Sequence, residues 1–385
     1  MVVTNTSIRV LLAGGGTGGH LYPALRLAEG LRAHARHLGL PPPEIAFVGN
    51  PDGLEGRVLG GREELYPLRL QGFHRGSVLD MVKENSAFFW LLLRGYLQSL
   101  RILRYFKPDV VVGTGGYVSG PPLYAATRKN IPTLIQEQNS YPGITTRLLA
   151  GRVDEVHVHY REAADYLKTK RPVRPTGNPV RALDADIPRE EAKRRLGFDP
   201  GRYLLTVIGG SQGAEPINRH LAQTLDWYRD QERLSLLWQC GARNVEKYQS
   251  LQTGEAAIRI RGFLENMDEV YAATDLVIAR AGALTLSELA LAGKPAILIP
   301  LPTAAANHQE INATSYAREG AAEVIAQQDL PSGALEEAID TLFRSPDRLA
   351  DMAVRAREQA RPNATEELVR AIYTLAEESL HVSEV

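Results

Sequence analysis

The stretch that decides the fold is IRVLLAGGGTGGH, which occupies residues 8–20. A mostly apolar run leads into glycines, and apolar residues then recur at helical spacing through 21–31. A strand that passes through a glycine-rich turn into a helix is the first unit of a parallel α/β sheet. The same order returns about 195 residues later as YLLTVIGGSQGAE, residues 203–215. Two such openings predict two doubly wound α/β domains, whose ligands bind at the carboxyl ends of the strands.

Further strands are expected where short apolar runs alternate with helical stretches. In the first half these runs are 44–48, 110–113, 133–136 and 155–158, and in the second half 234–238, 276–279 and 296–300.

Dense turn chemistry at 176–179 predicts the join between the two domains. A second break at 361–363 precedes a final helix, expected over 366–380. The predicted domains are therefore 1–179 together with 362–385, and 180–361.

Composition limits the class of protein. The 385-residue chain carries 44 Lys and Arg against 45 Asp and Glu, a formal net charge of -1, so no nucleic-acid partner is expected. The single cysteine, Cys240, excludes an internal disulfide and is typical of a reducing compartment. The N-terminus shows no apolar signal core, and the longest apolar run, 87–93, is far below the roughly 18 residues of a membrane span. These features predict a soluble, cytosolic protein.

The glycines at 14–19 formally satisfy the G-x-G-x-x-G fingerprint of dinucleotide-binding proteins. Residues without side chains let backbone N–H groups and a helix N-terminus approach phosphate oxygens. A dinucleotide site also requires an acidic residue after the second strand, where this chain has no carboxylate before Asp52. An NAD-dependent oxidoreductase is therefore only an alternative, and a tight structural turn is another. Neither glycine loop continues into Lys-Ser or Lys-Thr, which excludes the ATPase type of phosphate loop.

Two polar residues of the first half follow strands and are candidates for a site. His20 lies in the first turn of a helix, where the dipole disfavours an imidazolium and so favours a neutral, proton-accepting ring. A capping or packing histidine is an equally good interpretation. Asn139 follows the strand at 133–136 and is suited to a sugar hydroxyl, although such residues are also common turn formers.

The segment RAGALTLSE, residues 280–288, follows a strand and opens a helix. The N–H groups of 283–285 are suited to a phosphate, and Glu288, about one turn further on, to ribose hydroxyls. The alternative is a glutamate that complements the helix dipole, worth about 0.3–1 kcal/mol. The functional interpretation is favoured because one segment would then bind both the phosphate and the ribose of the same ligand.

No metal site is predicted. His157 and His159 share one strand face without clustered further ligands. Asp184 and Asp186 have the form of an acidic metal-binding pair, but their polar surroundings indicate a surface turn. Nothing near Cys240 indicates an activated thiolate.

A segment that is both basic and apolar spans residues 69–107, with seven Lys or Arg against two acidic residues. Its helix is expected to bury one stripe, formed by Phe89, Leu92, Leu93, Tyr96, Leu100 and Leu103. Phe88, Trp90 and Leu91 lie outside this stripe. Exposed apolar residues surrounded by basic residues indicate contact with anionic lipid. The alternatives are a helix buried on two sides and a dimer contact.

Seven motifs together carry a resemblance to a known family. The chain resembles the MurG family of N-acetylglucosaminyltransferases from about Ile8 to the final helix. The motifs are GGGTGGH at 14–20, GTGGYVSGP at 113–121, QEQN at 136–139, GNPVR at 177–181, GGSQGA at 209–214, RAGALTLSE at 280–288 and NHQEINA at 307–313.

The resemblance implies a GT-B fold, in which two Rossmann-like domains face each other across a cleft and the C-terminal helix crosses back onto the first domain. It implies inverting transfer of N-acetylglucosamine from UDP to the 4-hydroxyl of undecaprenyl-pyrophosphoryl-N-acetylmuramyl pentapeptide (lipid I), giving lipid II for peptidoglycan. No bound cofactor or metal is expected. A related transferase acting on diacylglycerol-type lipids is the alternative. The expected location is peripheral, on the cytoplasmic face of the cell membrane, with an anionic membrane surface and cell-wall synthesis proteins as partners.

The resemblance also implies roles for single residues. His20 would be the catalytic base, Leu264 and Arg181 would meet the uracil base, and Glu288 would hold the ribose. The remaining UDP-N-acetylglucosamine residues would be Thr17, Gly18, Gly19, Asn139, Ser211, Gln212, Ala283, Leu284, Thr285, Leu286, Ser287 and Gln309. The acceptor's diphosphate would face Gly15, Gly16, Gly115, Gly116 and Tyr117.

Overall fold

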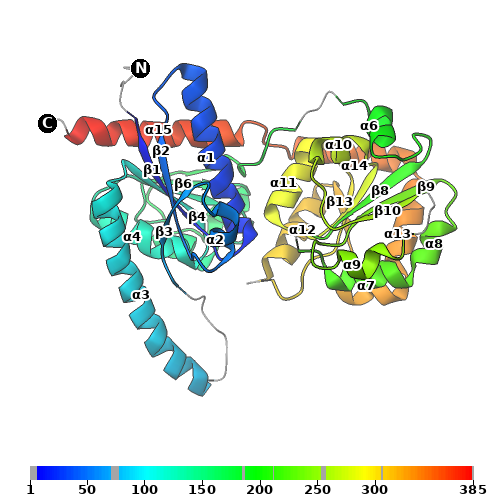
Figure 1. Cartoon of the computed structure of the whole chain (residues 1–385), viewed down its shortest axis with the longest axis horizontal. Helices are drawn as coiled ribbons and strands as arrows, with labels where there is room; N and C mark the ends of the chain where they lie inside the picture. The colour runs from blue at the N-terminus through cyan, green and yellow to red at the C-terminus, as the bar shows by residue number, and fades with distance from the viewer. Residues whose placement is uncertain are drawn as a thin grey trace. The chain divides into compact units, whose positions relative to one another are not determined.

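The computed structural model describes residues 7–70, 78–183, 187–210, 212–252, 257–304 and 307–383. The chain forms two compact units, each with its own sheet (Figure 1). Unit 1 comprises residues 1–180 and 363–385, and unit 2 comprises residues 181–362.

Unit 1 is built on a seven-stranded parallel sheet of order β3-β2-β1-β4-β5-β6-β7. Its strands are β1 (Arg9–Gly14), β2 (Glu44–Gly49), β3 (Glu64–Pro67), β4 (Val110–Gly115), β5 (Thr133–Glu137), β6 (Glu155–Val158) and β7 (Val173–Arg174). Its helices are α1 (Gly18–Leu38), α2 (Leu54–Leu59), α3 (Val78–Phe106), α4 (Gly120–Arg128), α5 (Ile144–Leu149) and α15 (Ala364–Ser383). The strand order reverses between β1 and β4, and this is the switch point at which such sheets bind ligands.

Alternation along the central strand β1 divides the core of unit 1 into two layers. Val10 and Leu12 belong to the cluster formed with α1 and α15, whereas Leu11 and Ala13 belong to the cluster with α3 and α4. Successive strand residues point to opposite faces, so a run buried throughout requires helices on both sides. The C-terminal α15 packs on α1, which confirms the predicted return of the last helix to the first domain (Figure 1).

Unit 2 repeats this plan with a six-stranded parallel sheet of order β10-β9-β8-β11-β12-β13. Its strands are β8 (Tyr203–Ile208), β9 (Leu234–Gln239), β10 (Ile258–Arg261), β11 (Leu276–Ala279), β12 (Ala296–Leu298) and β13 (Ala322–Val324). Its helices are α6 (Arg189–Arg195), α7 (Glu215–Gln223), α8 (Leu225–Arg229), α9 (Val245–Gln249), α10 (Met267–Ala273), α11 (Ala283–Ala292), α12 (His308–Arg318), α13 (Ala334–Phe343) and α14 (Pro346–Glu358). The switch point lies between β8 and β11. Two doubly wound parallel sheets confirm the predicted fold class.

The helix α3 confirms part of the predicted core stripe of the basic and apolar segment, because Tyr96 and Leu100 pack against the core and Leu103 is buried, and it corrects the rest. Leu92 and Leu93 are exposed, by 36% and 45%, while Leu91 packs partly against the core. The buried stripe instead runs through Gly95, Ser99, Ile102, Leu103 and Phe106. A Cβ atom at Gly95 would lie 2.9 Å from Leu70, so the glycine allows close packing. Two small residues in the stripe therefore shift the outward face to Trp90, Leu93 and Leu97, and the side chain of Phe88 lies outside the described residues.

Candidate functional site

The switch point of unit 1 brings together the glycine-rich loops that follow β1 and β4. Gly16 has a φ of 83°, and a Cβ atom there would lie 2.8 Å from the ring of Tyr117. A Cβ atom at Gly116 would overlap the carbonyl oxygen of Gly15, and Gly115 has a φ of 99°. The five residues expected to face the acceptor's diphosphate therefore lie together. Three of them, Gly16, Gly115 and Gly116, let the two loops pack more closely than residues with a side chain would allow.

A buried carboxylate that sequence reasoning missed lies beneath this loop. Glu55 in α2 is 2% exposed, and its Oε1 accepts a hydrogen bond of 2.7 Å from the backbone N–H of Gly16. A Cβ atom at Gly15 would overlap the same carboxylate. Burial, and secondarily the charge of Glu55, raises the pKa of Tyr117 above its usual value. The loop N–H of Gly16 is therefore engaged by the protein's own anion, and no motif around Glu55 signals this.

His20 is fixed by contacts from three elements. Its Nδ1 lies 3.1 Å from Oε1 of Gln138, which follows β5. Its backbone carbonyl accepts a bond of 2.7 Å from the hydroxyl of Thr114 in β4, and its N–H donates to the carbonyl of Thr17 over 3.2 Å. A Cβ atom at Gly115 would lie 2.8 Å from Nδ1, so the imidazole lies against that glycine. A partly exposed titratable ring is thus held at the carboxyl edge of the sheet.

The start of α1 is suited to negative charge. Thr17 occupies the N-cap, and Gly18 and Gly19 form the first turn, which contains no acidic residue. Thr17 and Gly19 are exposed, and the Thr17 side chain makes no capping bond to the helix. Helix N-termini carry a partial positive charge, so these three expected donor residues lie where an anionic group is favoured.

Asn139 takes part in a buried carboxylate network. Its backbone N–H and its side-chain Nδ2 both lie 3.1 Å from Oε1 of Glu137. The other oxygen of Glu137 accepts bonds from the Gly143 N–H at 3.0 Å and the Thr146 hydroxyl at 2.6 Å. The carboxylate of Glu137 therefore holds the turn after β5 in place, and Asn139 is one of the residues that donate hydrogen bonds to it.

In unit 2, α11 is the helix whose start is best suited to a diphosphate. It follows β11 at the switch point, its N-cap is Gly282, and its first turn, Ala283 to Thr285, contains no acidic residue. The helix after the other glycine loop differs, because α7 has Glu215 and a proline in its first turn. The hydrogen bond from Lys247 lowers the pKa of Glu215, which keeps that carboxylate charged. Gln212 of the loop before α7 is exposed, and Ser211 lies outside the described residues.

Glu288 is oriented by a buried tyrosine. The hydroxyl of Tyr271 in α10 donates to Oε2 of Glu288 over 3.0 Å. Burial, with the neighbouring carboxylate, raises the pKa of Tyr271 well above its usual value, so the hydroxyl stays a donor. Leu286 is fully buried, and the Ser287 hydroxyl donates to the Ala283 carbonyl at 3.0 Å. Ligand contacts of these last two residues would therefore come from their backbones.

The other expected donor residues lie in loops of unit 2. Leu264 follows β10 and is 6% exposed. Arg181 forms an ion pair of 2.7 Å with Asp268 in the first turn of α10. Gln309 in α12 accepts the backbone N–H of Leu301 through Oε1 at 3.0 Å. Leu264 is therefore buried, Arg181 is paired with an acidic residue, and the Gln309 hydrogen bond connects α12 to the loop after β12.

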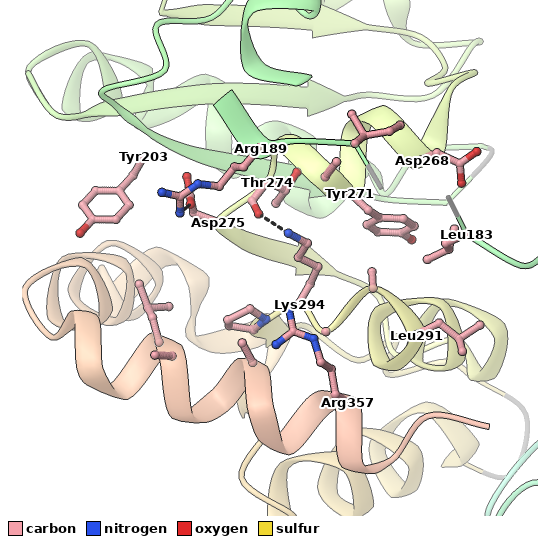
Figure 2. Close-up of a pocket in the computed structure, with 18 of the residues that line it drawn as sticks. Leu183, Arg189, Tyr203, Asp268, Tyr271, Thr274, Asp275, Leu291, Lys294 and Arg357 are labelled. Carbon is pink, nitrogen blue, oxygen red and sulfur yellow. Dashed lines mark hydrogen bonds and ion pairs between the residues drawn. The ribbon is translucent and has the colours of Figure 1, made fainter. Parts of the chain in front are cut away.

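A cavity of about 570 Å³ in unit 2 lies where β8, β11 and β12 begin (Figure 2). Tyr203 and Asp275, at the starts of β8 and β11, line it together with Lys294. The ammonium group of Lys294 donates to the Thr274 carbonyl over 2.8 Å, and burial lowers the pKa of Lys294 to about 8 (Figure 2). Tyr271 also lines this cavity, so its hydroxyl connects the cavity wall to Glu288.

Within the described residues, no group of three or more His, Cys, Asp or Glu side chains is placed to hold a metal ion. His157 is buried between the Thr176 hydroxyl at 2.6 Å and Glu155 at 2.8 Å. Burial raises the pKa of Cys240, as expected for an inert thiol. Asp184 and Asp186 lie outside the described residues. In the part of the chain that the structure describes, no helix has the length and apolarity needed to cross a bilayer.

Two doubly wound units, each with a helix start suited to phosphate at its switch point, are the architecture of the GT-B class of nucleotide-sugar enzymes. Family models for the N-terminal and C-terminal domains of glycosyltransferase family 28 match residues 10–158 and 204–368. The chain belongs to glycosyltransferase family 28 and, within it, to the MurG family.

The relatives match over nearly their whole length. A curated relative from Caldanaerobacter subterraneus subsp. tengcongensis is 40% identical over 375 residues, covering 96% of this chain and 100% of the relative. One from Acetivibrio thermocellus is 37% identical, with 95% and 97% covered. Both are named UDP-N-acetylglucosamine--N-acetylmuramyl-(pentapeptide) pyrophosphoryl-undecaprenol N-acetylglucosamine transferase. The crystal structure of Acinetobacter baumannii MurG matches with a TM-score of 0.76 at 29% identity, covering 96% of this chain and 100% of that one.

Proposed function

We propose that this chain transfers N-acetylglucosamine from UDP-N-acetylglucosamine to the 4-hydroxyl of the muramyl sugar of lipid I, giving lipid II. The observation that carries the proposal is the end-to-end similarity to enzymes named for this reaction, together with a polar constellation at each switch point. A diacylglycerol-type acceptor is the alternative that the fold alone leaves open. The oxidoreductase alternative loses its support, because the family models and the full-length relatives are glycosyltransferases.

Unit 2 is the proposed donor site. The start of α11 is assigned to the diphosphate, because the N–H groups of a first helical turn and the helix dipole both favour an anion. Glu288 is assigned to the ribose hydroxyls, with Tyr271 fixing the carboxylate. Leu264 and Arg181 are assigned to the uracil base, and Gln309 to the sugar hydroxyls. Asn139, which the resemblance also assigns to the donor sugar, belongs to unit 1. The donor would thus be matched at its base, ribose, diphosphate and sugar.

The proposed chemistry is a direct displacement with inversion. The 4-hydroxyl oxygen of the acceptor bonds to the anomeric carbon, while the bond from that carbon to the β-phosphate oxygen breaks and its electron pair leaves on UDP. His20 takes the hydroxyl proton, a role that contributes about 10²–10⁴-fold to the rate. The start of α11 stabilises the negative charge that grows on UDP, since preorganised N–H donors need no rearrangement during the reaction.

The reaction is tested with the purified chain, radiolabelled UDP-N-acetylglucosamine and a short-chain lipid I analogue. We expect transfer of label to the analogue, and no transfer to diacylglycerol in mixed micelles. The matched control is the Glu288→Ala variant under the same conditions, in which transfer should fall. Transfer to diacylglycerol alone, or to neither acceptor, would overturn the proposed acceptor.

We also propose that the outward face of α3 holds the chain on the membrane that contains the polyprenyl acceptor. Trp90, Leu93 and Leu97 are exposed by 72%, 45% and 49%, and Arg94 and Arg101 are exposed beside them. The amino-terminal half of α3 extends away from the sheet (Figure 1). Each apolar side chain gains roughly 1.5–3 kcal/mol if fully buried in lipid, and each cation about 1 kcal/mol near anionic headgroups. Together these support reversible, peripheral binding.

Vesicle sedimentation tests this surface. The triple variant Trp90→Ser, Leu93→Ser, Leu97→Ser should lose binding to vesicles containing phosphatidylglycerol. The matched control is Val354→Ser, which removes an apolar residue that is 49% exposed in unit 2 and should bind as the wild type does. Equal binding of the triple variant, with its fold verified by circular dichroism, would refute the assignment.

A further inference from the structure

The orientation of one buried amide can be assigned from its surroundings. Gln138 follows β5 and is 1% exposed. Its Nε2 lies near three oxygen atoms: the Thr114 carbonyl at 2.8 Å, the Gln136 carbonyl at 3.0 Å and the Gln136 side-chain Oε1 at 2.6 Å. An amide nitrogen donates and an amide oxygen only accepts. The opposite orientation would place an oxygen against three oxygens in a buried site, so the Nε2 position is determined.

The neighbouring amide supports the same assignment. Gln136 is fully buried, and its Nε2 donates to the Gly177 carbonyl at 3.1 Å and to Oδ1 of Asn178 at 2.9 Å. Its Oε1 is therefore the atom that accepts from Gln138. Backbone carbonyls thus fix both amides, and neither orientation depends on the histidine.

This orientation determines where the proton of His20 lies. Oε1 of Gln138 lies 3.1 Å from Nδ1 of His20. Because an amide oxygen only accepts, Nδ1 must be the protonated nitrogen. In a neutral imidazole one nitrogen carries the proton and the other the lone pair, so the lone pair of His20 is on Nε2.

We propose that Gln138 is a positioning residue, which selects the tautomer of His20 that presents Nε2 as the base. The inference rests on the proposed function, in which the hydroxyl proton of the acceptor passes to that nitrogen. UDP leaves with the electron pair of the broken bond to the anomeric carbon. The imidazolium then releases its proton to solvent, and Gln138 holds the proton on Nδ1 throughout.

Removal of the amide oxygen tests this role. Gln138→Leu keeps the approximate size and removes the acceptor. It should lower kcat by about tenfold to 100-fold, part of the roughly 10²–10⁴ that a positioned base contributes.

The matched control is Thr133→Val at the start of β5. Its hydroxyl is buried and bonded to Asp154 at 2.9 Å, so its loss should destabilise the same strand without touching His20. The measurements are kcat, the KM for UDP-N-acetylglucosamine and the melting temperature. Gln138→Leu should change kcat with KM nearly constant, whereas Thr133→Val should change only the melting temperature. A kcat for Gln138→Leu within twofold of wild type, or an equal rise in KM, would overturn the role.

Nitrogen NMR of histidine-labelled protein gives a readout that is independent of activity. The His20 resonances are identified by their loss in His20→Ala. The wild type should show a protonated Nδ1 and an unprotonated Nε2, and Gln138→Leu should shift the ring toward the opposite tautomer. A protonated Nε2 in the wild type would overturn the inference even if the transfer reaction is as proposed. The expected tautomer in the wild type, lost in Gln138→Leu without any fall in kcat, would instead overturn His20 as the base.

Discussion

Glu288 offers the sharpest test of the donor site, because its carboxylate has an identified buried partner. Glu288→Ala removes a charged acceptor from the ribose hydroxyls, and hydrogen bonds to charged groups contribute about 1.5–3 kcal/mol. Each 1.4 kcal/mol is a factor of ten in a binding constant, so the dissociation constant for UDP should rise about 10- to 150-fold. Titration calorimetry with UDP measures this directly, without the acceptor.

The Tyr271 bond of 3.0 Å provides the control for this measurement. Glu288→Ala leaves the buried hydroxyl without its acceptor, which should lower stability by about 1–3 kcal/mol. Tyr271→Phe removes the hydroxyl and keeps the carboxylate, so UDP binding should weaken by less than about tenfold. Urea unfolding separates the stability effect from the binding effect. UDP affinity equal to wild type in both Glu288→Ala and Glu288→Gln would refute the assignment of the ribose to this residue.

The other predictions concern the base, the membrane surface and a buried lysine. His20→Ala should lower kcat by roughly 10²–10⁴-fold with UDP affinity unchanged by calorimetry, and a parallel loss of both would make the residue structural. Binding of wild-type protein to anionic vesicles should weaken as salt increases, while the apolar contribution of Trp90 remains. Burial lowers the pKa of Lys294 to about 8, so the folded state loses this proton before the unfolded chain does near 10.4. The contribution of this group to the stability of the wild type therefore rises with pH between those values. The free energy of unfolding of Lys294→Met, relative to that of the wild type at the same pH, should be higher at pH 7 than at pH 10.

The sequence predicted the inner strands and missed the outer ones. The missed strands, β3, β7, β10 and β13, are the two edges of each sheet. Inner parallel strands are covered on both faces and read as continuous apolar runs, as in β4, where every residue is buried. Edge strands lack this signal. For example, β10 alternates Ile and Arg, and β7 is only two residues long.

The positions of the glycine loops and of the start of α11 could be predicted because strand, turn and helix follow one another in the motif itself. Their phosphate-binding role stays a prediction, which depends on backbone N–H groups next to small residues. Glu55 and Gln138 could not be ranked, because their importance comes from burial beside residues that are distant in sequence. One feature of the sequence did point to Gln138. It lies directly after β5 and two residues after Gln136, a spacing that places both side chains on the same side of an extended chain. The prediction for α3 was wrong at Leu92 and Leu93 for a related reason, because the buried stripe includes a glycine and a serine.

The two units use the same architecture but differ in the residues at their switch points, and this difference supports the separate roles proposed for them. In unit 1 the N–H of Gly16 already donates to the carboxylate of Glu55 over 2.7 Å, so a diphosphate beside this loop would rely on the start of α1 instead. In unit 2 the first turn of α11 contains no acidic residue, and its N-cap, Gly282, has no side chain to compete. The start of α11 is therefore the place that we propose for the diphosphate of UDP. Unit 1 has His20 beside its loop, and a histidine that accepts the proton of the attacking hydroxyl is what the proposed reaction requires there.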